Sequence, residues 1–197
     1  AAIAAALPTL HRYPDGSGFY LRQALAKRIG VPADGIILGN GSNDIIELAV
    51  RAFLRPGDEA VMADQAFVIY QMVVQAAGAV ARRVPLRRFT HDLEAIKAAI
   101  GPATRLVFLA NPNNPTGTIY KRDAWEDFLA DVPPHVLVVA DDAYADYVED
   151  PEYPDSLSYQ RRDRLLLTLR TFSKIYGLAG VRVGYGVGPL EVVEVLN

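Results

Sequence analysis

Short apolar runs alternate with amphipathic segments along the whole chain. Seven of the runs predict strands, at residues 36–38, 60–62, 80–84, 106–110, 136–140, 165–169 and 183–187. Helices are predicted to begin near Gly18, Ser42, Phe67, Asp92 and Arg122, and after Pro189. The run 136–140 is apolar at every position, as expected of a strand that is covered on both faces. This alternation predicts an α/β fold with a mostly parallel seven-stranded sheet and helices on both faces.

Composition narrows the possible functions. The chain has 197 residues, 51% of them apolar, and a formal net charge of −3, which is enough for a full core in one domain. No basic run is present, so we expect no nucleic-acid partner. The apolar runs are too short to span a bilayer, so we expect no membrane partner. The absence of cysteine excludes disulfides and thiolate metal sites; we expect no bound metal and a cytoplasmic location.

Chemically informative residues follow three of the predicted strands. Asn114 comes shortly after the run 106–110, Asp141 directly follows the run 136–140, and Lys174 comes after the run 165–169. In open parallel sheets, ligands bind at the carboxyl ends of the strands. We therefore expect these three side chains to share one site.

The segment 39–44 reads Gly-Asn-Gly-Ser-Asn-Asp and precedes an apolar helix. Its glycines permit a tight turn, and Ser42 can cap the helix. The free N–H groups around Gly41, Ser42 and Asn43, together with the helix dipole, favour a phosphate. An ordinary turn with a capping serine explains the same string, and on this segment alone that simpler interpretation is preferred.

The string Asn-Pro-Asn-Asn-Pro-Thr-Gly at residues 111–117 is more specific. Pro115 pushes Asn114 toward an extended conformation, and the rigid turn can direct the Asn114 amide at a ligand oxygen. A plain turn built from turn-forming residues is the alternative. The full seven-residue string favours the ligand-binding interpretation.

Asp141 ends a fully apolar strand, where burial of a carboxylate is costly. A buried carboxylate needs a cationic partner, and a protonated pyridine nitrogen would be one. Asp142 should point to the opposite face of the sheet, because side chains alternate along a strand. Tyr144, three residues after Asp141, could reach the same pyridine ring. For Asp141 taken alone, a helix cap or a strand-end turn remains the alternative.

Lys174 follows a buried strand in the string Thr-Phe-Ser-Lys, whereas most lysines are solvated surface charges. An amine in such a place is available to attack an aldehyde. Thr171, Ser173 and Arg182 could complete a phosphate cage with the helix that begins at Ser42, since the arginine fork can bind two phosphate oxygens. A surface ion pair is the alternative for Arg182.

Together these strings resemble the active-site set of fold-type I aminotransferases of class I and II, and most of all the histidinol-phosphate aminotransferases. These enzymes use pyridoxal 5′-phosphate (PLP), whose aldehyde forms a Schiff base with an amine that also shuttles protons. The resemblance implies that Lys174 is that amine, and that Asn114 and Tyr144 contact the phenolic oxygen of the cofactor. Phe67 stands where the family stacks an aromatic ring on the cofactor, and a plain core phenylalanine is the alternative.

The resemblance also implies an assembly. Tyr13 stands where the family has a tyrosine that reaches the cofactor phosphate of the neighbouring subunit, so a homodimer is expected. The resemblance runs from about His11 to Asn197 and makes residues 1–197 most of the large, PLP-binding domain. We expect the N-terminal arm, and a smaller C-terminal domain with the arginine that binds the substrate carboxylate, to lie outside this sequence. The family usually has glutamate where this chain has Asp142, which preserves the charge.

The implied reaction is transamination of histidinol phosphate, a small-molecule amino donor, with the 2-oxo acid 2-oxoglutarate. A threonine-phosphate decarboxylase and an aromatic amino-acid aminotransferase on the same scaffold are alternatives. A dinucleotide-binding Rossmann domain fits the alternation, but the chain lacks Gly-x-Gly-x-x-Gly after the first strand. An inactive cofactor-domain fragment is a further alternative, and a chain complete at 197 residues is expected to bind PLP weakly and to transaminate poorly.

Overall fold

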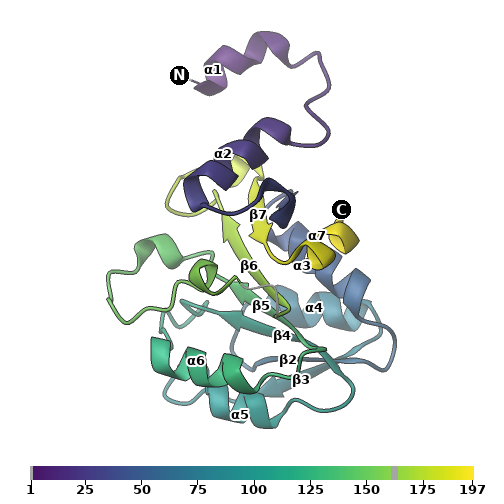
Figure 1. Cartoon of the computed structure of the whole chain (residues 1–197), viewed down its shortest axis with the longest axis vertical. Coiled ribbons are helices and arrows are strands. Elements are labelled where there is room, and N and C mark those ends of the chain that lie inside the picture. The colour runs from purple at the N-terminus through teal and green to yellow at the C-terminus, as the bar shows by residue number, and fades with distance from the viewer. Residues whose placement is uncertain (1, 161–163) are drawn as a thin grey trace.

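The computed structural model describes residues 2–160 and 164–197, and its centre is a seven-stranded sheet (Figure 1). The strands are β1 (Ile36–Gly39), β2 (Glu59–Ala63), β3 (Val80–Val84), β4 (Thr104–Ala110), β5 (Leu137–Asp141), β6 (Leu166–Thr171) and β7 (Gly184–Val187). Their order is β1-β7-β6-β5-β4-β2-β3. Neighbours from β3 to β6 are parallel, whereas β7 is antiparallel to both β6 and β1. The predicted mostly parallel sheet is confirmed, and the predicted strand ends lie within two residues of those observed.

In the described part of the chain, six of the seven α-helices begin at or one residue after the predicted position. The helices are α1 (Ala2–Ala6), α2 (Phe19–Ile29), α3 (Ser42–Phe53), α4 (Val68–Ala76), α5 (Leu93–Ala98), α6 (Arg122–Asp131) and α7 (Leu190–Leu196). The helix α1 has no buried residue and lies apart from the sheet, beyond α2 (Figure 1). Over residues 2–160 and 164–197, no helix is long and apolar enough to cross a membrane.

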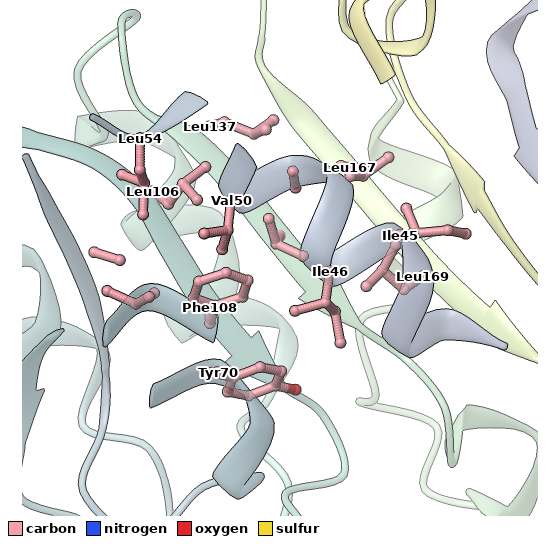
Figure 2. Close-up of a cluster of buried hydrophobic side chains, with 14 of the residues drawn as sticks. Ile45, Ile46, Val50, Leu54, Tyr70, Leu106, Phe108, Leu137, Leu167 and Leu169 are labelled. Atoms are coloured by element: carbon pink, nitrogen blue, oxygen red, sulfur yellow. The ribbon is translucent and has the colours of Figure 1, made fainter. Parts of the chain in front are cut away.

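Helices cover both faces of the sheet, as the fully apolar strands require. On one face, Ile45 and Val50 of α3 belong to the same buried cluster as Phe108 of β4 (Figure 2). On the other face, Trp125 of α6 belongs to a second buried cluster with Val107 of β4. Adjacent residues of β4 therefore enter different cores, because side chains alternate along a strand. The two cores fix the central strands from both sides.

The strand directions bring several loops to one edge of the sheet. The strands β4, β5 and β6 are parallel, so Asn114, Asp141 and Lys174 all follow carboxyl ends at that edge. Because β1 and β6 are both antiparallel to β7, β1 also ends there, and α3 begins close by. The fold thus places a helix N-terminus beside the three strand ends, as expected for a ligand site in an open α/β sheet.

Candidate active site

A cavity of about 240 Å³ lies at this edge of the sheet. Ten of the twelve site residues predicted from the sequence line it: Ser42, Asn43, Phe67, Asn114, Asp141, Tyr144, Thr171, Ser173, Lys174 and Arg182. Of the other two, Gly41 directly precedes the lining residue Ser42 in sequence, and Tyr13 does not line the cavity. The structure also adds residues that the sequence did not single out: Tyr70, Ala110, Pro112, Ala143 and Ala179.

One end of the cavity is formed by the start of α3. Ser42 was expected to cap this helix, but that expectation is wrong: Gly41 occupies the cap position with φ 83° and ψ 168°, and no side chain caps the helix. The carboxylate of Asp44 instead accepts a hydrogen bond from the backbone N–H of Asn40 at 3.0 Å. The Ser42 hydroxyl is therefore free of capping and lies along the cavity beside the first N–H groups of the helix, which lack intrahelical partners.

Arg182 brings a positive charge to the same end. Its guanidinium donates to the backbone oxygens of Asn40 at 3.1 Å and Ala179 at 3.0 Å, and lies 3.4 Å from Ser173 Oγ. Over residues 2–160 and 164–197 it forms no ion pair with a carboxylate, so the surface ion pair does not describe it. A Cβ on Gly41 would collide with this guanidinium, so glycine is what allows the close approach. Backbone N–H groups, hydroxyls and a guanidinium are the groups that bind anions in proteins, so this end of the cavity is suited to an anion.

Gly184 sets how closely β7 approaches the start of α3. A Cβ on Gly184 would collide with the backbone nitrogen of Ser42 and would lie 2.6 Å from the carbonyl carbon of Gly41. We expect Gly184→Ala to lower the free energy of unfolding by about 2–3 kcal/mol, since backbone atoms cannot move aside cheaply. Urea denaturation measures this, with Gly180→Ala as the matched control because no atom lies within 4 Å of a Cβ at Gly180. Equal losses in the two variants would contradict this account.

Asp141 also lines the cavity. Its side chain is buried, with 6% of the residue exposed, and it accepts hydrogen bonds from the Tyr70 hydroxyl at 2.6 Å and the Ala143 N–H at 3.2 Å. Burial raises the pKa of Asp141, whereas these two donors and the charge of Lys174 act in the opposite direction. In the described part of the chain, no lysine or arginine forms an ion pair with it. A buried carboxylate in this state is suited to pair with a cationic group that enters the cavity.

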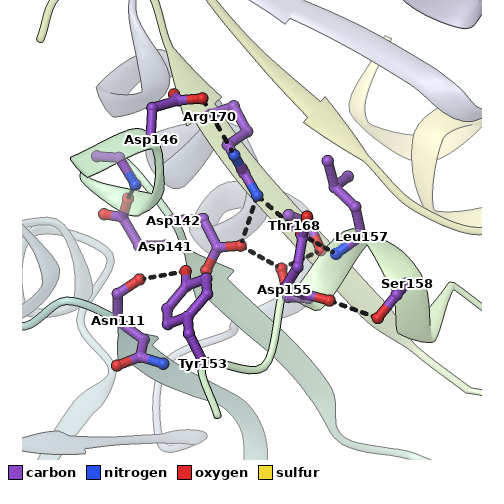
Figure 3. A network of polar contacts seen from close by, with 12 residues as sticks. Asn111, Asp141, Asp142, Asp146, Tyr153, Asp155, Leu157, Ser158, Thr168 and Arg170 are labelled. Atoms are coloured by element: carbon purple, nitrogen blue, oxygen red, sulfur yellow. Dashed lines mark hydrogen bonds and ion pairs between the residues drawn. The ribbon is translucent and has the colours of Figure 1, made fainter. Parts of the chain in front are cut away.

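Asp142 is not among the residues that line the cavity and belongs to a separate polar network (Figure 3). It accepts a hydrogen bond from Ser156 Oγ at 2.6 Å and pairs with Arg170 at 3.3 Å. Arg170 also pairs with Asp155 at 2.8 Å and with Asp146 at 3.8 Å. Adjacent aspartates at the end of β5 therefore have different surroundings, as the alternation of side chains predicts.

The Asp142 network makes stability depend on pH. Burial raises the pKa of Asp142 to about 7, although Arg170 and Ser156 oppose the shift. Between about pH 4, the ordinary aspartate pKa, and about pH 7, the folded state holds a proton that the unfolded state has lost. Folding stability from this group therefore falls as pH rises through that window, by at most about 1.4 kcal/mol per pH unit.

We expect Asp142→Asn to remove this contribution. The difference in unfolding free energy, variant minus wild type, should increase as pH rises from about 4 to about 7. Above that range the difference should stay constant. Urea denaturation of both proteins at a series of pH values measures it. Two curves that stay parallel through the window would show that Asp142 is ionised throughout.

Lys174 lines the same cavity. It is half-buried, and its Nζ lies 4.8 Å from the centroid of the Tyr144 ring. No hydrogen-bond partner of Nζ is found within residues 2–160 and 164–197, so the amine is available to a ligand there. The turn that leads to it is held by Thr171, whose Oγ1 accepts from the Ser173 N–H at 3.1 Å.

The remaining predicted residues differ in how the structure places them. Phe67 is half-buried and lines the cavity while also packing on the core, so its stacking on a cofactor stays a prediction. In the turn 111–117, Asn113 supplies the bracing bonds, to the Gln65 oxygen at 2.9 Å and to Thr116 Oγ1 at 2.8 Å. Asn114 is left to face the cavity. Tyr13 is fully exposed and away from the cavity, and its role in a neighbouring subunit stays a prediction.

Comparison with known proteins supplies the family. The sequence profile of Aminotransferase class I and II matches residues 1–197. "Histidinol-phosphate aminotransferase 2" of Pseudomonas fluorescens is 53% identical over 197 residues, which are 100% of this chain and 53% of that protein. "Histidinol-phosphate aminotransferase" of Moorella thermoacetica is 53% identical over 186 residues, which are 94% of this chain and 48% of that protein.

Solved structures agree with this assignment. The crystal structure of histidinol-phosphate aminotransferase from Sinorhizobium meliloti in complex with pyridoxal-5′-phosphate superposes with a TM-score of 0.93 at 30% identity, over 98% of this chain and 52% of that one. The chain spans about half the length of the curated relatives it matches. With its whole length matched by the family profile, the chain belongs to the class I and II aminotransferases.

Proposed function

We propose that this chain is the cofactor-binding part of a PLP-dependent histidinol-phosphate aminotransferase. The enzyme transfers the amino group of histidinol phosphate to 2-oxoglutarate and forms imidazole-acetol phosphate and glutamate, a step of histidine biosynthesis. The observation that carries the proposal is one cavity that holds the available amine of Lys174, the buried carboxylate of Asp141 and the anion-binding end at Arg182. The identities to histidinol-phosphate aminotransferases support this choice of substrate.

The residues present fit PLP at each of its polar groups. The start of α3, with Ser42, Ser173 and Arg182, would hold the phosphate, because donors and positive charge gather there. Asp141 would pair with the protonated ring nitrogen, which supplies the cation that this carboxylate lacks. Lys174 would attach the aldehyde carbon. Two further cavity-lining residues, Asn114 and Tyr144, would contact the phenolic oxygen, and Phe67 would cover one face of the ring.

Each of these residues then has a defined task. When bound, PLP supplies an aldehyde that joins covalently to amines and a ring that accepts the electrons released at the substrate Cα. Lys174 Nζ would hold the cofactor and, once its amine is free, would carry the proton that leaves the Cα of the amino donor. Asp141 would keep the ring nitrogen protonated through its negative charge. Arg182 and the α3 N-terminus prevent the phosphate from shifting while the amines exchange.

The proposal extends to the whole protein. We propose a cytoplasmic homodimer in which Tyr13 reaches the cofactor phosphate of the neighbouring subunit; its full exposure in this chain supports that role. We also propose that 1–197 is most of the PLP-binding large domain, and that a smaller domain supplies the arginine for the substrate carboxylate. The greater length of the relatives supports the second domain.

The test has two stages. The protein is incubated with PLP, reduced with borohydride and analysed by intact mass and peptide mapping, and a pyridoxyl adduct on Lys174 is expected. Glutamate formation from histidinol phosphate and 2-oxoglutarate is then compared with carbon dioxide release from threonine phosphate and with transamination of aromatic amino acids. Carbon dioxide release would replace the proposal with a decarboxylase, whereas an adduct without any turnover would identify an inactive cofactor domain.

A further inference from the structure

Tyr70 is a fully buried residue that reaches the cavity wall and has no task in the chemistry described above. It lies in α4, three residues after Phe67. Its ring stacks on Phe108, with centroids 4.8 Å apart and planes at 8°, and it meets Phe67 edge-on at 5.6 Å. Figure 2 shows Tyr70 beside Phe108 within the core, with its oxygen directed away from that ring. The two aromatic contacts restrict the ring, so the core determines the position of the hydroxyl.

The Tyr70 hydroxyl is committed to one acceptor. It donates to Asp141 Oδ2 at 2.6 Å, a length typical of an O–H donor on a charged carboxylate. The other carboxylate oxygen, Oδ1, accepts from the Ala143 N–H at 3.2 Å. Within the described residues each oxygen thus has one donor, and the two donors together define the orientation of the carboxylate plane. A phenylalanine would fill the same space in the core but would leave Oδ2 without its donor.

The charges around this pair favour a donor that is neutral. Burial raises the pKa of Asp141, and among the influences that lower it, the hydrogen bond from Tyr70 is the largest. Burial and the nearby charges of Asp141 and Asp142 raise the pKa of Tyr70 well above its ordinary value, so the hydroxyl keeps its proton. A neutral donor stabilises the carboxylate without neutralising it. The charge therefore remains available to a cation in the cavity.

We propose that Tyr70 is a positioning residue that holds the Asp141 carboxylate in the orientation in which it meets the ring nitrogen of the cofactor. This inference rests on the proposed function and deepens it. It also gives the start of α4 two tasks, because Phe67, the residue before the helix, lines the cavity while Tyr70 aligns the Asp141 carboxylate.

The test uses the full chain with ¹³C-labelled aspartate carboxyl groups, free of cofactor, and assigns the Asp141 signal with Asp141→Asn. Tyr70→Phe should raise the pKa of Asp141 by about one unit and weaken PLP binding about tenfold, as the loss of one charge-assisted hydrogen bond requires.

Tyr120→Phe is the matched control, since Tyr120 is also buried and no partner of its hydroxyl is found in the described part of the chain. The control should change neither quantity. An Asp141 titration that superposes on the wild type in folded Tyr70→Phe would overturn the proposal.

A second measurement does not depend on that variant folding. In the wild type, the Tyr70 hydroxyl proton should give a slowly exchanging low-field NMR signal that is absent from Asp141→Ala. A hydroxyl proton that exchanges freely in the wild type would also overturn the proposal. If the wild type acquires no PLP adduct, the proposed function fails, whereas the two NMR measurements still decide whether Tyr70 holds Asp141.

Discussion

Replacing Lys174 with alanine is expected to abolish covalent attachment of PLP and to lower transamination by a factor of at least about 10²–10⁴, the range for loss of a proton-transfer group alone. The physical reason is that the proposed function gives one amine two tasks, holding the cofactor and moving the substrate proton. The cavity should still bind PLP without a covalent bond, because the groups near Arg182 that are proposed to hold the phosphate remain. Borohydride reduction followed by intact mass measures attachment, and glutamate formation measures turnover.

A surface lysine provides the matched control. Lys121 is exposed and pairs with Glu152, so Lys121→Ala should retain both the adduct and the activity. The fold of Lys174→Ala should also survive, because the described residues offer Nζ no hydrogen bond that the substitution would remove. A borohydride-stable adduct in Lys174→Ala at the wild-type level would show that another amine holds the cofactor.

The fold and most of the cavity lining could be predicted because each depends on local strings. The apolar run before Asp141 identifies a buried strand, and the strand end identifies the edge where ligands bind. The same alternation fits a Rossmann domain, which the family assignment excludes. What separates the two is the set of side chains at the strand ends, including Lys174.

The parts that could not be predicted depend on contacts between distant segments. Tyr70 and Asp141 are 71 positions apart in sequence, and nothing local to either residue indicates their hydrogen bond. The one available signal was the spacing of Phe67 and Tyr70, since residues three apart share one side of a helix. The capping of α3 was mispredicted for a related reason. Serine is a common cap, but the positive φ of the cap position requires glycine here, so Gly41 takes it.

In its proposed role, Asp141 illustrates how a functional group can oppose stability. Its carboxylate is buried at a cost, and in the described structure it is held by neutral donors rather than by an ion pair. Such a residue weakens the cofactor-free fold, and the proposed function explains its presence because the bound ring nitrogen would supply the missing cation. Removing its charge should therefore affect stability and chemistry in opposite directions.

Asp141→Asn is expected to keep the PLP adduct on Lys174 but to slow loss of the amino donor Cα proton by about 10²–10³, the usual effect of removing one preorganised electrostatic group. The unfolding free energy of the cofactor-free variant should equal or exceed that of the wild type, since a buried charge is gone while Tyr70 keeps an acceptor. Release of deuterium from a Cα-deuterated donor measures the first effect, and urea denaturation measures the second.

Asp142→Asn is the matched control, because the Asp142 carboxylate faces Arg170 rather than the cavity. This variant should release deuterium at nearly the wild-type rate. Deuterium release at the wild-type rate in Asp141→Asn would exclude a role for this carboxylate in the proton transfer.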